Sequence, residues 1–222
     1  MNFFDDYTVM MSVFKKNAPW YFKPFILIYG VSIASIIFAY YWLCHFTCRK
    51  KITGQSPQII FEPTILGMWH TGFSIYLATF LKLPRHIWLT HPLAYMAPWY
   101  FVGKMMGIVH LIPGSSGHEG FEASEKLLVF LKEGYSTSIL PDGPTGPVHQ
   151  LRKGILHMAA KSGLPIIPLR SSCQYGIRLP TWDNKIIPIP FISRMEVHLG
   201  ESLFVTHETI ESAAKILMER LS

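Results

Sequence analysis

Charged side chains are scarce in this sequence. They make up only 15% of the 222 residues, whereas an average soluble domain has about 25%. Half of the residues are hydrophobic and no strict repeat occurs, so the chain is neither a disordered tail, nor a coiled coil, nor a collagen-like fibre. Three cysteines are too few for a disulfide framework, which indicates a reducing compartment. The net charge of +6 favours anionic partners such as lipid headgroups, acyl carrier protein or nucleic acid.

The hydrophobic residues are concentrated near the N-terminus. The 25 residues 24–48 contain no charged side chain, if His45 is taken as neutral. About 20 apolar residues in a helix match the roughly 30 Å hydrocarbon core of a bilayer. Aromatic and basic residues flank the run on both sides, as at a membrane interface. The sequence therefore predicts a membrane-anchoring segment over residues 1–48, with a hydrophobic helix at about 24–44, and a main domain over residues 49–222.

Several arrangements fit this segment. The helix could span the bilayer, or it could dip into one leaflet, because basic residues at both ends suit shallow insertion near an anionic leaflet. Equal numbers of basic residues on the two sides leave the orientation open under the positive-inside rule. A buried core helix is a third alternative. A cleaved signal peptide is disfavoured, because Asp5 and Asp6 stand where basic residues belong and no small-residue cleavage site follows. Cys44 and Cys48 are part of no zinc-binding spacing, so no metal is expected there.

The main domain alternates short apolar runs with helical patterns. Five runs are typical of buried strands: Thr64–Trp69, His86–Leu89, Ile108–Ile112, Thr137–Leu140 and Pro165–Leu169. Amphipathic helices are predicted over Glu119–Lys132 and Thr206–Leu221, with Thr206 as the N-cap of the second. This alternation predicts an α/β fold with a mostly parallel central sheet flanked by helices. Residues 141–190 contain half of the 16 prolines and are expected to be shaped loop.

Two short motifs are candidates for chemistry. In Met68–Gly72, His70 follows an apolar strand, and open α/β sheets bind ligands at that end of their strands. Taken alone, a structural histidine is the more common alternative. In Pro141–Pro147, Asp142 lies between a strand and a run of glycine and proline. Such a rigid turn lets the backbone approach a ligand closely, although a plain surface turn is the alternative.

Two further segments follow along the chain. Ser162–Pro168 contains a glycine that ends a helix, followed by a strand bracketed by prolines, and prolines in a strand indicate an edge or an end. Thr181–Asp183 and Ile187–Phe191 form an aromatic and proline-rich stretch. This stretch is expected to wall a pocket for an acyl chain or a headgroup.

Taken in order, these segments resemble the bacterial lysophospholipid acyltransferase family, within the glycerol-phosphate acyltransferase superfamily. The closest branch has the runs Trp-His-Gly, Asp-Gly-Pro-x-Gly-Pro, Ser-Gly-x-Pro-Ile-x-Pro and Trp-Asp ahead of Ile-Pro-x-Pro-Phe. The matching fragments lie at 69–72 (with Thr71 inserted), 141–147, 162–168 and 182–191. The resemblance covers roughly residues 49–205 and implies that family's α/β fold behind an N-terminal hydrophobic membrane helix.

The resemblance also implies a reaction. In that superfamily a histidine acts as general base on the acceptor hydroxyl, which attacks the thioester of acyl-CoA or acyl carrier protein, without a metal or an organic cofactor. Carried over, the base is His70, and the Pro-Asp-Gly block corresponds to the block that binds the phosphate region of the acceptor. The residues expected in the site are His70 and Asp142 for catalysis, and Gly72, Ser74, Pro141, Gly143, Pro144, Thr145, Gly146, Arg152 and Lys153 for substrate binding.

Two positions depart from the family pattern. Where an aspartate usually orients the histidine, five residues after it, this chain has Ile75, and a slot that often holds arginine contains Thr145. A base needs something to set its tautomer and orientation, and the hypothesis is that Asp142 does so. The cations expected to bind phosphate are Arg152, Lys153 and Lys104, as point charges.

The function predicted from the sequence is that of a membrane-bound acyltransferase that acylates a lysophospholipid or a related lipid. Membrane lipids and acyl carrier protein are the expected partners. Nucleic acid is not expected, because basic clusters that flank a hydrophobic helix are explained by lipid headgroups. The expected location is the cytoplasmic face of a bacterial inner membrane, where thioester donors are made. The main alternative is a catalytically impaired relative that binds or presents lipid; a different transferase or a hydrolase lacks a supporting motif.

Overall fold

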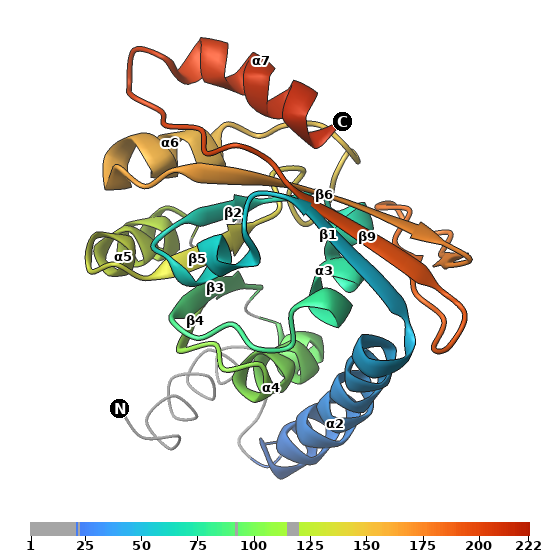
Figure 1. Cartoon of the computed structure of the whole chain (residues 1–222). Helices are drawn as coiled ribbons and strands as arrows, with labels where there is room; N and C mark the ends of the chain where they lie inside the picture. The colour runs from blue at the N-terminus through green and yellow to red at the C-terminus, as the bar shows by residue number, and fades with distance from the viewer. Residues whose placement is uncertain (1–20, 22, 92, 115–119) are drawn as a thin grey trace.

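The fold is a central sheet with helices on both of its faces (Figure 1). The structure is a computed structural model that describes residue 21 and residues 23–91, 93–114 and 120–222. The expectations that concern residues 1–20, including Asp5 and Asp6, lie outside the described residues, as does the predicted start of a helix at Glu119.

The sheet has seven strands in the order β1-β9-β6-β2-β5-β3-β4. They are β1 (Arg49–Gly54), β2 (Ile65–Gly67), β3 (His86–Thr90), β4 (His110–Pro113), β5 (Ser136–Ile139), β6 (Ile166–Gln174) and β9 (Arg194–Leu199). Every neighbouring pair is parallel except β6 and β9. The predicted α/β fold with a mostly parallel sheet is therefore confirmed, and the five predicted strands are present. Two short strands, β7 (Ile177–Arg178) and β8 (Ile186–Ile187), form a separate antiparallel pair.

The expectation that residues 141–190 are shaped loop is wrong, and so is the edge alternative for the prolines at β6, whereas Pro165 does stand at an end, directly before that strand. Residues 141–190 contain α6 (Gly154–Ser162) and the nine residues of β6, which lies inside the sheet between β9 and β2. Pro168 is tolerated because β6 changes partners there. It pairs with Gly67, the last residue of β2, and pairing with β9 begins at Leu169. The N–H that proline lacks is thus missing at the end of one ladder rather than in its middle.

The helices form two layers. On one face of the sheet lie α2 (Lys23–Thr47), α3 (Phe73–Thr79) and α4 (Ala97–Met105), and on the other lie α5 (Gly120–Lys132), α6 and α7 (Ile210–Leu221). Successive strand residues point to opposite faces: in β2, Ile65 packs under α5 to α7, while Leu66 packs on the α3 side. Short 3-10 turns are η2 (Pro57–Phe61), η3 (His70–Gly72) and η4 (Ala94–Met96).

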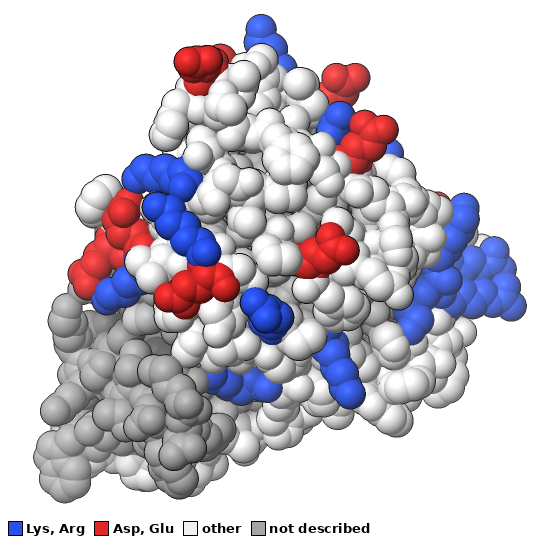
Figure 2. Space-filling model, turned by 60° about the vertical axis from the view of Figure 1, so that its left-hand side comes forward, with Lys and Arg blue, Asp and Glu red and all other residues white. Residues whose placement is uncertain are grey.

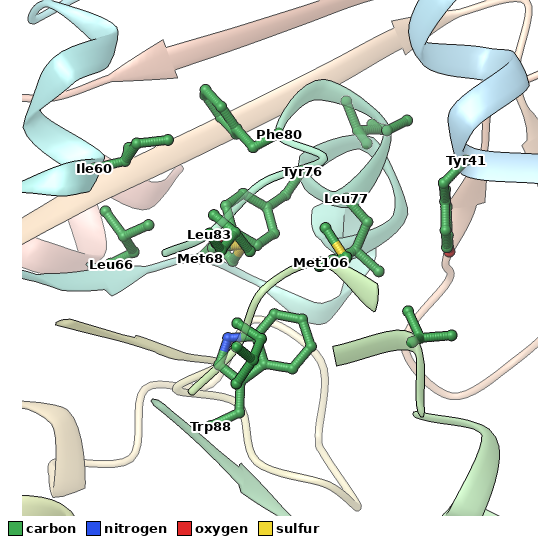
Figure 3. Close-up of a cluster of buried hydrophobic side chains, with 14 of the residues drawn as sticks. Tyr41, Ile60, Leu66, Met68, Tyr76, Leu77, Phe80, Leu83, Trp88 and Met106 are labelled. Carbon is green, nitrogen blue, oxygen red and sulfur yellow. The ribbon is translucent and has the colours of Figure 1, made fainter. Parts of the chain in front are cut away.

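Helix α3 is fixed to the sheet by its buried side chains. Tyr76 is fully buried and lies among Met68, Leu77 and Met106 (Figure 3). Its hydroxyl is 3.0 Å from Oγ of Ser138 in β5, and burial raises the pKa of the Tyr76 phenol. Because η3 leads directly into α3, the anchoring of α3 also sets the position of η3, which begins with the candidate histidine.

Helix α2 extends three residues beyond its predicted end at 44 and lies against the main domain. Gly30 allows α2 to approach α4 closely, since a Cβ there would lie 2.7 Å from the Phe101 ring. Nearer its C-terminal end, Tyr41 donates a hydrogen bond to Ser74 of α3 at 3.1 Å. Apolar side chains on the remaining surface of α2 are exposed. The helix is long and apolar enough over Pro24–Thr47 to cross a membrane.

The C-terminal helix begins later than the sequence indicates. The prediction placed its N-cap at Thr206, but α7 begins at Ile210 with Thr209 in the cap position. The backbone N–H of Thr206 donates to Oγ1 of Thr209 at 2.9 Å. These threonines therefore close a turn in front of the helix, and the predicted cap at Thr206 is wrong.

His86 in β3 is expected to make the fold sensitive to acid. Nδ1 of the buried ring is 3.3 Å from the Pro84 carbonyl oxygen, and Nε2 has no partner in the described part of the chain. Burial lowers the pKa of His86 from 6.5 to about 4. Below pH 6.5 the unfolded chain therefore binds a proton that the folded chain does not. The free energy of unfolding should fall by up to about 3 kcal/mol between pH 6.5 and pH 4.

Unfolding measured in detergent at about pH 7.5 and about pH 5 checks this expectation, with His86→Gln as the matched variant. Glutamine does not titrate, so the variant should lose about 2 kcal/mol less than the wild type between the two pH values. The same pH dependence in both proteins would contradict the role assigned to His86.

Candidate active site

His70 and Asp142 lie at the carboxyl ends of two neighbouring parallel strands. In the pairing of β2 with β5, Gly67 stands opposite Ile139, and each of the two side chains comes three residues after its paired position. From there the chain turns to opposite faces of the sheet, through α3 after β2 and through α6 after β5. Open α/β sheets bind ligands at such a point, because the diverging connections leave a crevice.

The two side chains are hydrogen-bonded. Nδ1 of His70 is 2.5 Å from Oδ1 of Asp142, and the backbone N–H of His70 donates to the two carboxylate oxygens at 3.4 and 3.3 Å. Asp142 is fully buried, whereas 16% of the His70 side chain is exposed. A carboxylate at Nδ1 selects the tautomer with its proton on Nδ1. The lone pair is then on Nε2, which has no partner among the described residues, so this atom can accept a proton from a bound molecule.

Trp182 lies against the His70 ring, with centroids 5.0 Å apart and the planes at 61°. The indole belongs to the connection between β7 and β8, and this connection is tied to η3 because Thr71 donates to the Asp183 carbonyl oxygen at 2.7 Å. The inserted Thr71, a departure from the family motif, thus holds the segment that carries Trp182. The exposed fraction of Trp182 is 41%, which leaves the indole available to a ligand as well as to His70.

Asp183 is held in its ionised form. Burial alone would raise the pKa of Asp183, but hydrogen bonds from Thr181 and Lys185 and the positive charge of Lys185 keep it below its usual value. Thr181 donates to Oδ1 at 2.5 Å, and Nζ of Lys185 is 3.1 Å from Oδ2. The Asp183 carboxylate therefore stabilises the connection between β7 and β8 through contacts within that connection.

The loop 141–147 closes around the Arg152 guanidinium. Gly143 has φ +68°, and a Cβ there would lie 2.9 Å from Cζ of Arg152. The guanidinium donates to the Gly146 carbonyl at 2.7 Å and is 3.5 Å from the Thr145 hydroxyl. The resembled motif often has an arginine at the position of Thr145. In this chain the Arg152 guanidinium lies beside that residue. Pro141, Gly143 and Gly146 are buried, while Pro144 and Thr145 are exposed.

At two positions glycine is required because a neighbouring side chain leaves no space for a Cβ. A Cβ on Gly72 would lie 1.9 Å from Oγ of Ser171, so η3 packs directly on β6. A Cβ on Gly146 would lie 2.6 Å from the Trp182 ring. These contacts hold η3, the loop 141–147 and Trp182 in one arrangement, and they give Gly72 and Gly146 a structural reason beside the predicted binding role.

Three of the residues that the sequence analysis expected to bind substrate or phosphate make their contacts away from the loop 141–147. Ser74 is fully buried and accepts the hydrogen bond of Tyr41, so it faces the interior rather than a bound ligand. Lys153 is paired with Glu211 of α7. Lys104 donates to the Val109 carbonyl at 2.6 Å on α4. Of the expected phosphate-binding cations, Arg152 is the one whose head group contacts the loop 141–147.

Three further residues at the site were not among the catalytic and substrate-binding residues selected from the sequence, although Trp182 lies in the stretch that was expected to wall a pocket. Trp182 and Thr71 are described above, and His149 is the third. Its Nε2 is 3.2 Å from Oγ1 of Thr71, and its ring lies 5.4 Å from that of Trp69. The Trp-Asp motif was a signal for Trp182, but no local pattern marks Thr71 or His149, because their contacts join segments more than 70 residues apart. Among the residues that the structure describes, no group of three His, Cys, Asp or Glu side chains could hold a metal ion.

Comparisons with known proteins support the fold. No protein-family model matches the chain. A curated protein of Rickettsia prowazekii (strain Madrid E), named Uncharacterized protein RP090, is 26% identical over 206 residues, covering 85% of this chain and 91% of that protein. The crystal structure of the 1-acyl-sn-glycerophosphate (LPA) acyltransferase PlsC from Thermotoga maritima is similar with a TM-score of 0.50, at 13% identity, covering 96% of this chain and 95% of that one. The chain has a PlsC-like α/β fold with one long apolar helix near its N-terminus.

Proposed function

We propose that this protein is a membrane-bound acyltransferase that moves a fatty acyl chain from a thioester donor to a hydroxyl of a lysophospholipid or a related lipid. The observation that supports this most is the hydrogen bond between buried Asp142 and His70 at the carboxyl ends of β2 and β5 in a PlsC-like fold. Asp142 supplies the carboxylate that the sequence lacks at Ile75. A histidine with an orienting carboxylate speaks against the alternative of a catalytically impaired lipid-binding relative.

In the proposed reaction, Nε2 of His70 takes the proton of the acceptor hydroxyl. The hydroxyl oxygen forms a bond to the thioester carbonyl carbon, the carbon–sulfur bond breaks, and the proton passes from Nε2 to the leaving thiolate. Asp142 accepts the hydrogen bond of Nδ1–H and stabilises the imidazolium that forms between these two proton transfers. The products are an ester of the acceptor and a free thiol, CoA or carrier protein.

We place the phosphate of the acceptor beside the loop 141–147. Arg152 is exposed there, it forms no ion pair with a described carboxylate, and it contacts the backbone of Gly146 and the hydroxyl of Thr145. A guanidinium can bind phosphate oxygens with two parallel hydrogen bonds. The close contacts of Gly143 with Arg152 and of Gly146 with the Trp182 ring hold the guanidinium and the indole against the same loop.

Arg152→Ala is expected to weaken acceptor binding. Loss of one charge-assisted contact should raise the KM for a phosphate-bearing acceptor by about 10- to 100-fold, with kcat changed by less than about threefold. Lys153→Ala is the matched control, because that side chain is paired with Glu211. Steady-state kinetics with varied acceptor checks this; an unchanged KM in Arg152→Ala would remove the arginine from the binding site.

The membrane part of the proposal concerns α2. Contacts from Gly30 with Phe101 to Tyr41 with Ser74 hold this helix against the domain over much of its length, while apolar side chains on its other face are exposed. This packing favours a helix embedded in one leaflet over one that stands clear of the domain and spans the bilayer. We place the site on the cytoplasmic face of a bacterial inner membrane, where the thioester donors are made.

Transfer of a labelled acyl chain tests the proposed function. The purified protein in detergent is given labelled acyl-CoA or labelled acyl carrier protein together with extracted bacterial lysolipids, and the same mixture without protein is the control. A labelled diacyl lipid would support the proposal and identify the acceptor. No product from either donor, with a folded and lipid-bound protein, would overturn it in favour of the impaired relative.

A further inference from the structure

Four apolar side chains are exposed together at the start of β7 and on the turns that precede β7 and β9. They are Tyr175, Ile177, Phe191 and Ile192, with exposed fractions of 62%, 53%, 74% and 57%. The turns are joined because Oγ of Ser193 donates to the Tyr175 carbonyl at 3.0 Å. We call these four residues the tip surface.

The tip surface adjoins the C-terminal end of α2. The backbone N–H of Phe191 donates to Oγ1 of Thr47 at 3.1 Å, and the thiol of Cys48 is 3.3 Å from the carbonyl oxygen of Ile189. Ile36 and Leu43 are exposed and stand seven residues apart, so they share a face of the helix. Thr47, one turn beyond Leu43, continues this face toward Phe191. An apolar surface therefore runs along α2 and onto the tip surface.

Arginines surround the tip surface. Arg49, the first residue of β1, pairs in register with Arg194 of β9, and the Arg194 guanidinium lies 5.9 Å from the centroid of the Tyr175 ring. Arg178 follows Ile177 and is exposed. Within the described ranges, no carboxylate pairs with any of these three arginines, whereas nearby Lys51 pairs with Glu196. Figure 2 shows Lys and Arg side chains gathered at the right-hand edge of that view, with very little acidic surface beside them.

We propose that the tip surface is a second membrane contact, by which the main domain rests on a leaflet of anionic phospholipid. Exposed aromatic and aliphatic side chains beside arginines that pair with no described carboxylate match the chemistry of a bilayer interface, where rings and aliphatic chains enter the acyl region and guanidinium groups bind phosphates. The continuity with the exposed face of α2 favours a membrane over a protein partner. The proposal rests on the membrane association proposed above and not on acyl transfer.

The contact would bring the leaflet to the candidate active site. Residues 177 to 187, from β7 to β8, lead from the tip surface to Trp182, which lies against His70. On the other side, Tyr41 of α2 bonds to α3, directly after η3. A lipid in the leaflet would therefore lie close to the crevice between these two segments and would reach His70 without leaving the membrane surface.

A fluorescent label at position 191 tests the proposal. The full chain with Phe191→Cys is labelled with an environment-sensitive dye and reconstituted into vesicles of phosphatidylethanolamine and phosphatidylglycerol, with or without a spin-labelled lipid that quenches on contact. Phe121→Cys is the matched control, since Phe121 is a 79% exposed phenylalanine on α5, in the opposite helical layer. The wild-type chain, treated in the same way, corrects for its own thiols.

The expected result is quenching at position 191 at least about threefold stronger than at position 121. Adding Arg194→Gln to the Phe191→Cys chain should reduce that quenching, and pure phosphatidylcholine vesicles should reduce it too. Equal quenching at positions 191 and 121, with the protein still floating with the vesicles, would overturn the proposed membrane contact of the tip surface. That result would favour a protein partner for this surface. A wild-type chain that does not float with the vesicles would instead overturn the membrane association itself.

Discussion

His70→Ala is expected to lower kcat for acyl transfer by about 10⁴-fold, the upper range for loss of a general base. In our account Nε2 of His70 is the one atom that takes the proton of the acceptor hydroxyl and returns it to the thiolate. The side chain is partly exposed, and its ring contacts are with Asp142 and Trp182. The fold and the membrane association should therefore survive its removal.

The measurement is the rate of labelled product formation, with flotation on vesicles and thermal unfolding as checks of the protein. Glu125→Gln is the matched control, because this exposed carboxylate on α5 pairs with Lys161 of α6 and takes no part in the contacts of His70 and Asp142. It should retain the wild-type rate. Turnover by His70→Ala within about tenfold of the wild type would remove His70 as the base.

Asp142→Asn is expected to lower kcat by about 10³- to 10⁴-fold with a smaller change in KM. The amide has nearly the same shape, so the buried turn stays filled. An amide N–H facing the ring would favour the tautomer with its proton on Nε2, which cannot accept another proton from the acceptor. The amide would also stabilise the imidazolium less than a carboxylate does.

The kinetic constants of Asp142→Asn separate two roles. A loss in kcat supports Asp142 as the residue that positions His70. A loss confined to KM for the acceptor would instead make Asp142 a binding residue, as the family block alone implies. Because the Asp142 carboxylate also accepts the backbone N–H of His70, thermal unfolding of the variant is measured in parallel.

Much of the fold could be predicted from the sequence because β2 and β3 are short, largely apolar and bounded by turns. Strand β1 could not, since Arg49–Gly54 shows no alternation and its pairing with β9 joins residues about 145 apart. The alternation of polar and apolar residues in Arg194–Leu199 was a signal for β9 that the sequence analysis missed. The position of β6 was misjudged because its proline marks a change of partner strand rather than an edge. The start of α7 was misplaced because Thr206 resembles an N-cap in the sequence, whereas it forms a turn with Thr209 in front of the helix.

The candidate site likewise has residues that could be predicted from the sequence and residues that could not. His70 and Asp142 follow buried strands within motifs, so each could be selected from local sequence, and the pairing of β2 with β5 brings them together. The positions of Ser74 and Lys153 depend on contacts with α2 and α7, which no local pattern encodes. Trp182, Thr71 and His149 are part of the site through contacts between distant segments. The catalytic and binding roles stay predictions until the variants are measured.

The most direct test of the account is a single acyl-transfer assay on the wild type, His70→Ala, Asp142→Asn and the double variant. If Asp142 acts through His70, the double variant should be no slower than His70→Ala, because residues that act as a unit are not additive. The account predicts labelled lipid from the wild type and a similar, roughly 10⁴-fold loss in His70→Ala and in the double variant. Losses that multiply in the double variant, or a His70→Ala protein that still forms product at the wild-type rate, would contradict it.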